Sequence, residues 1–135
     1  DQTFESVKNF VAKIGKKSVE VYEWPGYVTT RVMMPMINEA AYALMENVAS
    51  AKDIDMALES GCGMQKGPLH LADEMGLDSV LFHLEHLFHE LGEAKYRPCP
   101  LIKKLVRAGH LGVKSGQGFF VYEDKHNELD LPIAK

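Results

Sequence analysis

Three histidines, His83, His86 and His89, lie close to Glu85 and Glu90 in one predicted helix. Imidazole and carboxylate groups are common zinc ligands, so this spacing suggests a metal site. At about 100° per residue, however, His89 is turned roughly 120° away from His83, and only two of the histidines share a face. No second motif supplies the remaining ligands, so we prefer a solvated helix face and expect no metal.

Residues 115–118 read Ser-Gly-Gln-Gly, like a fragment of a phosphate-binding loop. A dinucleotide loop needs a longer glycine fingerprint between a strand and the helix whose N-terminus holds the pyrophosphate. The sequence around residues 115–118 predicts neither element. We therefore expect a structural turn there and no cofactor-binding residue in this chain.

The other reactive side chains point to packing. His70 and His110 stand alone beside apolar residues, without a nucleophile at a recognisable elbow, and are interpreted as packing or capping residues. Methionines are adaptable and suit an acyl-chain pocket or a subunit contact, although core filling is preferred for most of them. They are Met33, Met34, Met36, Met45, Met56, Met64 and Met75.

Composition limits the class of protein. The chain has 135 residues, 46% hydrophobic and 25% charged, which predicts one globular domain. A net charge of -4 with scattered basic residues argues against nucleic acid. The apolar run 32–48 contains polar residues and is shorter than the roughly 18 residues of a membrane span, so no membrane is expected. Without a signal peptide, Cys62 and Cys99 predict free thiols and a cytoplasmic location.

The N-terminal quarter predicts a helix and then a strand. Apolar residues at helical spacing run from Phe4 to Ile14, and Gly15 follows as a C-terminal cap. Residues 18–23 alternate between apolar and charged side chains, which indicates a strand exposed on one face. Its partner is left open: it lies outside this chain, in a second copy, or in a hairpin with residues 119–122.

The rest of the chain reads as helical. After a break at Trp24-Pro25-Gly26, a helix is predicted as far as Val48, apolar on more than one side and kinked by Pro35, hence central or packed on a partner subunit. Four shorter helices follow: from a Ser50 capping box to Gly61, from Pro68 to Met75, from Asp78 onward, and from Pro100 to Ala108. Residues 124–135 are expected to be a polar tail.

Six short motifs occur in a fixed order along the chain: Pro25 to Arg31, Pro35 to Ala40, Gly67 to Leu69, Gly76 to Asp78, Lys95 to Pro98 and Gly112 to Phe119. Together they resemble one family, the C-terminal domain of the bacterial 3-hydroxybutyryl-CoA and 3-hydroxyacyl-CoA dehydrogenases. The resemblance implies a mainly α fold, a helical domain of the 6-phosphogluconate dehydrogenase C-terminal-like type over residues 25–123. Residues 1–24 would be the last helix and strand of a Rossmann domain.

The resemblance also implies a function. In that family the Rossmann domain binds NAD and holds a catalytic His-Glu pair, while the helical domain closes over the acyl-CoA and forms the dimer. We therefore expect a homodimer that binds acyl-CoA, with NAD as the cofactor of the full-length enzyme. By itself this chain is expected not to transfer hydride. Two rivals are a short chain that works with a separate dinucleotide-binding partner, and a non-catalytic acyl-CoA-binding or oligomerisation module.

Two departures from the family fall at the implied site. Thr30 replaces the catalytic-site Asn that precedes Arg31, and a hydroxyl offers one donor on a shorter reach than a carboxamide. Gln65-Lys66 replaces Pro-Met before Gly67-Pro68. Lys66 either attracts a CoA phosphate or is solvated, and we prefer solvation. The expected substrate-binding residues are Thr30, Val28, Met64, Gln65, Lys66 and Pro68.

Overall fold

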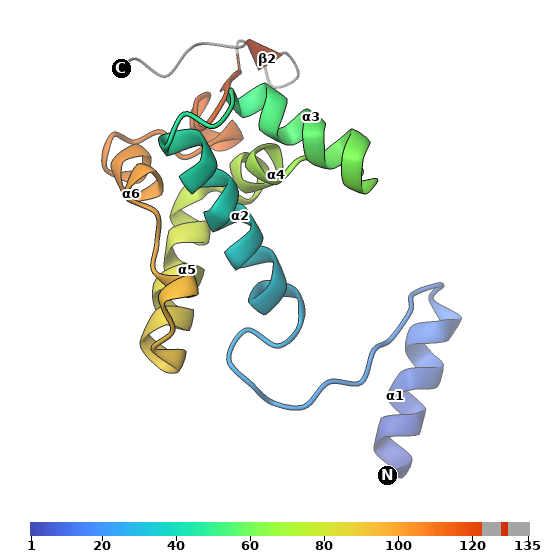
Figure 1. Cartoon of the computed structure of the whole chain (residues 1–135). Helices are drawn as coiled ribbons and strands as arrows, with labels where there is room; N and C mark the ends of the chain where they lie inside the picture. Colours follow the sequence, from blue (N-terminus) through green and yellow to red (C-terminus); the bar gives the residue numbers. More distant parts are fainter. Residues whose placement is uncertain (123–127, 130–135) are drawn as a thin grey trace.

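The computed structural model describes residues 1–122 and 128–129 (Figure 1). Within them the chain is mainly helical, as the sequence predicts. The elements in chain order are α1 (Gln2–Lys13), α2 (Thr29–Met45), α3 (Ala51–Cys62), α4 (Pro68–Met75), α5 (Leu77–Leu91), η1 (Ala94–Tyr96), α6 (Pro100–Arg107), η2 (Val113–Ser115), β1 (Val121–Tyr122) and β2 (Glu128–Leu129). No helix among these residues is long and apolar enough to cross a lipid bilayer.

Helix α2 is central, which confirms the expectation from its wide apolar stripe. It packs against α3, α4, α5 and α6, and Met34, Ile37 and Ala41 are fully buried on it. It runs through Pro35 as one helix and ends at Met45, earlier than the predicted Val48. The end is set by Asn47, whose positive φ of 58° places it in the left-handed conformation that closes helices.

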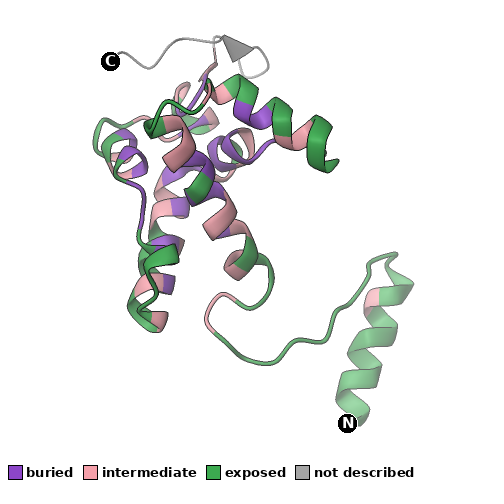
Figure 2. Ribbon diagram, viewed as in Figure 1, coloured by how far each residue is buried: buried purple, intermediate pink, exposed green. Residues whose placement is uncertain are grey.

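The predicted starts of the shorter helices are close to the observed ones. The Ser50 side chain accepts a hydrogen bond from the backbone N–H of Asp53, which is the predicted cap of α3. Pro68 and Pro100 occupy the first turns of α4 and α6, where a missing N–H costs nothing. Figure 2 shows the buried residues gathered where these helices face α2 and α5.

The segment before residue 25 differs from the sequence prediction. Helix α1 forms, but none of its residues is buried, and Figure 1 shows it set apart from the helical body. The strand predicted over residues 18–23 does not form in this single chain, where the segment has no regular structure. A strand needs backbone partners along its edge, and none of the described strands pairs with it.

The C-terminal strand finds a different partner from the suggested hairpin. Val121 pairs with Leu129 and Tyr122 with Glu128, in antiparallel register. Residues 119–122 therefore make no hairpin with residues 18–23. The predicted polar tail 124–135 lies outside the described residues, apart from the backbone of β2.

Candidate functional site

A tight turn leads into the helix that carries Thr30. The N–H of Tyr27 donates to the carbonyl oxygen of Trp24 at 2.9 Å, and Gly26 has a φ of 76°. Pro at the second position and a left-handed Gly at the third are typical of a type II turn. A Cβ on Gly26 would lie 2.8 Å from Cδ2 of Leu87, so the turn packs directly on α5.

Arg31 holds the start of α2. Its backbone N–H donates to Gly26 O at 3.2 Å, and its guanidinium lies 5.7 Å from the centroid of the Trp24 ring. Val28 supplies no side-chain cap and is exposed, whereas Thr30 is half-buried. Both predicted substrate residues on α2 therefore sit on a first turn that is fixed from the preceding segment.

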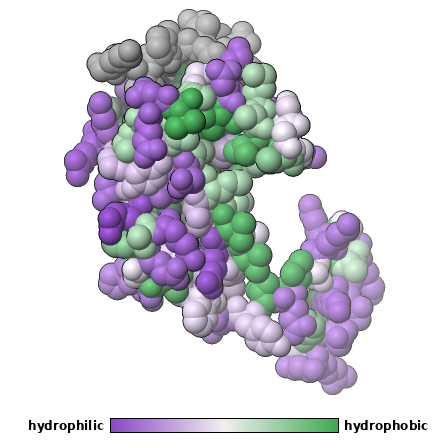
Figure 3. Space-filling view, viewed as in Figure 1, coloured by the Kyte–Doolittle hydropathy of each residue, from purple (hydrophilic) through white to green (hydrophobic). Residues whose placement is uncertain are grey.

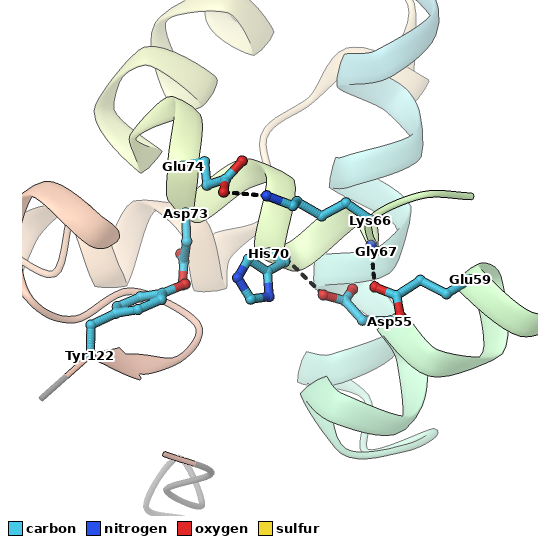
Figure 4. A network of polar contacts seen from close by, with 8 residues as sticks. All are labelled: Asp55, Glu59, Lys66, Gly67, His70, Asp73, Glu74 and Tyr122. Atoms are coloured by element: carbon cyan, nitrogen blue, oxygen red, sulfur yellow. Dashed lines mark hydrogen bonds and ion pairs between the residues drawn. The ribbon is translucent and has the colours of Figure 1, made fainter. Parts of the chain in front are cut away.

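The loop at residues 64–68 is held by carboxylates. The N–H of Gly67 donates to Oε1 of Glu59 at 2.7 Å, and the Lys66 ammonium pairs with Glu74 of α4 (Figure 4). Met64 is half-buried, Gln65 exposed and Pro68 buried as the first residue of α4. The Lys66 charge is thus engaged within the domain.

Asp55 of α3 caps α4 from a different helix. Its carboxylate accepts hydrogen bonds from the N–H groups of Leu69 at 2.9 Å and His70 at 2.8 Å (Figure 4). Burial raises the pKa of Asp55, and these two hydrogen bonds oppose the rise. A Cβ on Gly67 would lie 2.1 Å from Cγ of Asp55, so only glycine fits there.

A second buried carboxylate anchors the C-terminal segment. Asp73 of α4 accepts hydrogen bonds from the N–H groups of Phe119 and Phe120 and from the Tyr122 hydroxyl. The Ser115 hydroxyl accepts from Leu111 N at 2.8 Å within the same loop. Residues 115–118 are therefore a structural turn, which confirms the preference over a phosphate loop.

Asn38 fastens another pair of segments. Its Nδ2 donates to Arg97 O at 2.9 Å, and its Oδ1 accepts from Cys99 N at 2.8 Å. The side chain is 3% exposed. It thereby ties the segment between α5 and α6 to the central helix.

Sequence reasoning missed the roles of these three buried polar residues. A signal was present, since Asn38, Asp55 and Asp73 each occupy a position on the apolar side of a predicted helix. A polar residue there must find hydrogen-bond partners when it is buried. The partners lie 14 to 61 residues away in the chain, so periodicity could not name them.

The described histidines and cysteines are not grouped as metal ligands. No group of three or more His, Cys, Asp or Glu side chains suited to a metal ion occurs among the residues that the structure describes. On α5, the Phe82 ring stacks on His86 and meets His83 at its edge. Cys62 is exposed and Cys99 buried, and both are free.

The predicted substrate residues fall into two groups. Thr30 and Val28 lie at the start of α2, and Met64, Gln65, Lys66 and Pro68 lie at the junction of α3 and α4. Within the described part of the chain, no hydrogen bond or ion pair joins the groups. Chemically, they offer the Thr30 hydroxyl, the exposed Gln65 carboxamide, apolar surface and a fixed backbone, while the Lys66 ammonium is paired with Glu74.

These features define a mainly helical domain whose buried polar side chains join its segments through hydrogen bonds. The sequence model of the C-terminal domain of 3-hydroxyacyl-CoA dehydrogenases matches residues 26–122. The chain belongs to this family.

Individual relatives agree with the family match. The chain is 49% identical over 125 residues to the probable 3-hydroxybutyryl-CoA dehydrogenase of Bacillus subtilis, covering 93% of the chain and 44% of that protein. It is 46% identical over 122 residues to the 3-hydroxybutyryl-CoA dehydrogenase of Bradyrhizobium diazoefficiens, covering 90% and 42%.

A solved structure shares the fold. The crystal structure of (S)-3-hydroxybutyryl-CoA dehydrogenase from Ralstonia eutropha superposes with a TM-score of 0.87 at 42% identity, covering 92% of this chain and 44% of that one. The chain thus spans less than half the length of the relatives that it matches.

Proposed function

We propose that this chain forms the substrate-binding and dimerisation half of an NAD-dependent 3-hydroxyacyl-CoA dehydrogenase that acts on short substrates such as 3-hydroxybutyryl-CoA. The observation that carries the proposal is the 49% identity, over 93% of the chain, to a relative named for that reaction. The family resemblance assigns NAD and the catalytic His-Glu pair to a Rossmann domain. Hydride transfer therefore needs that domain as well as this one.

The start of α2 is the proposed contact with the reacting part of the substrate. Thr30 occupies the position of the family Asn, and its single hydroxyl has only one hydrogen to donate. Val28 offers exposed apolar surface one helical turn before Val32. Because the turn at Gly26 and the Arg31 backbone hold this helix start, the Thr30 side chain begins from a defined position.

The loop 64–68 is proposed to line the acyl side. Its backbone is fixed by Glu59 and its continuation into α4 by Asp55, so it presents a pre-ordered surface. The pairing of Lys66 with Glu74 supports a role in holding this loop and weakens the idea of a phosphate contact.

A homodimer is the proposed assembly. Val32 is more than half exposed on the central helix. Figure 3 shows hydrophobic surface along the lower half of α2. A second copy of the chain would cover this face.

A non-catalytic acyl-CoA-binding or oligomerisation module is the alternative, and Thr30 is the observation that favours it. An Asn carboxamide has an NH2 group that donates and a carbonyl oxygen that accepts, whereas the Thr30 side chain is shorter and has a single hydroxyl. Contacts that need both groups of the carboxamide are therefore lost. Such a module would keep the fold and the interface but would not support turnover.

A chimera separates the two functions. In this chimera, this chain replaces the matching C-terminal region of the Bacillus subtilis relative. The assay follows NADH-dependent reduction of acetoacetyl-CoA. The proposal predicts turnover by the chimera and none by this chain alone. Binding of acetoacetyl-CoA by a folded chimera without turnover would instead favour the module.

A further inference from the structure

Glu59 holds both ends of the loop between α3 and α4. Gly63 closes α3 in the left-handed conformation, with a φ of 70°, and its N–H donates to the backbone carbonyl oxygen of Glu59 at 3.1 Å. At the other end of the loop, the N–H of Gly67 donates to Oε1 of the Glu59 carboxylate at 2.7 Å (Figure 4). The carbonyl and the carboxylate of one residue therefore set where the loop begins and where it ends.

The far end of the loop has no freedom to shift along α3. Asp55, one turn earlier on this helix, accepts from the N–H groups of Leu69 and His70, and the proline at the first position of α4 has no N–H. A Cβ on Gly67 would lie 2.1 Å from Cγ of Asp55, so the Gly67 backbone lies directly against this carboxylate. Every backbone N–H from residue 67 to residue 70 thus donates to a carboxylate of α3.

Three residues remain between the two held ends, Met64, Gln65 and Lys66. The Lys66 ammonium pairs with Glu74 of α4, so its charge is engaged within the domain. Met64 is half-buried and Gln65 is exposed. Because both ends of so short a loop are fixed, the places of Met64 and Gln65 follow from the contacts made by Glu59.

We propose that Glu59 is a positioning residue for the acyl side of the substrate. It acts through the loop, whose backbone its carbonyl and carboxylate fix, so that Met64 and Gln65 are offered to the acyl group in one place. A surface that is ordered before binding loses no further freedom when the ligand arrives, and affinity gains accordingly. The inference rests on the proposed role of residues 64–68 in lining the acyl side.

Removal of the Glu59 carboxylate should loosen the loop and leave the fold intact. Alanine at this position keeps the backbone carbonyl that accepts from Gly63, and it favours the helical conformation. Asp55 continues to hold the start of α4. The change is therefore confined to the hydrogen bond on the N–H of Gly67, a bond strengthened by the charge of its acceptor.

Amide exchange in this chain measures the hold on the loop directly. In Glu59→Ala, protection of the Gly67 amide should fall at least about tenfold, while the amides of Leu69 and His70 keep their protection. Glu59→Gln retains a carbonyl oxygen that accepts, so it should keep most of the protection at Gly67. Unchanged protection of Gly67 in Glu59→Ala, or an equal loss at Leu69 and His70, would overturn the proposal.

Kinetics of the chimera described above test the link to the substrate. Glu59→Ala should raise KM for acetoacetyl-CoA at least about fivefold and leave kcat within about twofold, because the loop binds substrate and transition state alike. Glu59→Gln should bring KM back to within about twofold of the parent chimera. A purely structural role would lower the amount of folded enzyme, and with it the apparent kcat, without changing KM.

Glu85→Ala is the matched control, because Glu85 is an exposed carboxylate on α5, and it should change neither KM nor exchange at Gly67. An unchanged KM in Glu59→Ala, together with a loosened Gly67 amide, would overturn the positioning role, while turnover by the parent chimera would keep the proposed function. No turnover by the parent chimera would overturn the proposed function itself, and the positioning role with it.

Discussion

Three buried polar side chains hold this domain together at the residue scale. Asn38, Asp55 and Asp73 each bond to backbone groups of another segment, and no buried side-chain polar atom among the described residues is left without a partner. Removing one partner of such a bond leaves a buried group unsatisfied, which costs more than the bond contributes. Substitutions at Asn38, Asp55 or Asp73 are therefore expected to lower the free energy of unfolding more than substitutions at exposed polar residues.

The glycine beside Asp73 provides a test of this view. Gly118→Ala is expected to lower the free energy of unfolding by at least about 2 kcal/mol, because the added Cβ displaces the carboxylate from Phe119 and Phe120. Urea denaturation measures the change.

Gly61→Ala is the matched control. Gly61 lies in α3 with nothing within 4 Å of an added Cβ, so alanine should stabilise by roughly 0.5 to 1 kcal/mol. If Gly118→Ala and Gly61→Ala lower the free energy of unfolding equally, the loss does not come from the contact between Gly118 and Asp73.

A second residue-scale prediction concerns Thr30. In the chimera, Thr30→Asn is expected to raise kcat about tenfold, which corresponds to about 1.4 kcal/mol, the worth of one good hydrogen bond in the transition state. Steady-state kinetics with acetoacetyl-CoA and NADH measure the effect.

The neighbouring substitution Thr29→Asn serves as the control, since Thr29 is exposed at the same helix start. It should leave kcat unchanged. Equal kcat for Thr30→Asn and the parent chimera would mean that the threonine hydroxyl already suffices.

At the scale of elements, most helix ends are encoded locally. Ser50 caps α3, Pro100 opens α6, and glycines in the left-handed conformation end α1, α3 and α5, at Gly15, Gly63 and Gly92. Helix α4 is the exception, because its donors are satisfied by Asp55 from α3. Local signals thus place the helices, and one long-range cap joins two of them.

The α3 cap gives a prediction at this scale. Ser50→Ala is expected to cost about 1 kcal/mol of unfolding free energy, because the Ser50 hydroxyl bonds both the N–H and the carboxylate of Asp53. Ser60→Ala, an exposed position in the same helix, should be neutral or slightly stabilising. A loss of the same size at Ser60 would show that the hydroxyl at Ser50 has no capping role.

At the scale of the whole molecule, apolar surface remains uncovered. Phe4, Val7 and Phe10 of α1 are exposed, and so are Val28 and Val32 at the start of α2. A helix as short as α1 is marginal in water without tertiary contacts. The chain therefore presents apolar faces that none of its own described residues covers.

The proposed dimer can be tested by its oligomeric state and its dissociation constant. Sedimentation should report a dimer or larger species, and Val32→Glu should raise the dimer dissociation constant at least about tenfold, because a carboxylate would enter the interface without a partner. Met56→Glu on α3, also about half exposed, is the control and should not change the assembly. A monomer at all concentrations would contradict this interface.

The sequence by itself determined the helices, most of their ends and the family, because these depend on neighbouring residues and on motif order. Six residues of α5 have the spacing of core positions: Val80, Leu84 and Leu87 are buried, and Leu81, Phe88 and Leu91 are partly buried against the same core. The alternation over residues 18–23 failed, since a strand exists only where a neighbouring strand bonds to it.

Only the tertiary structure decided how the polar residues act. It placed Asp55 at the start of α4, Asp73 against Gly118, and Lys66 beside Glu74. Such contacts join residues that the chain separates, and burial sets both their hydrogen bonds and their pKa values. No periodic pattern carries that information, because it arises only when the helices pack.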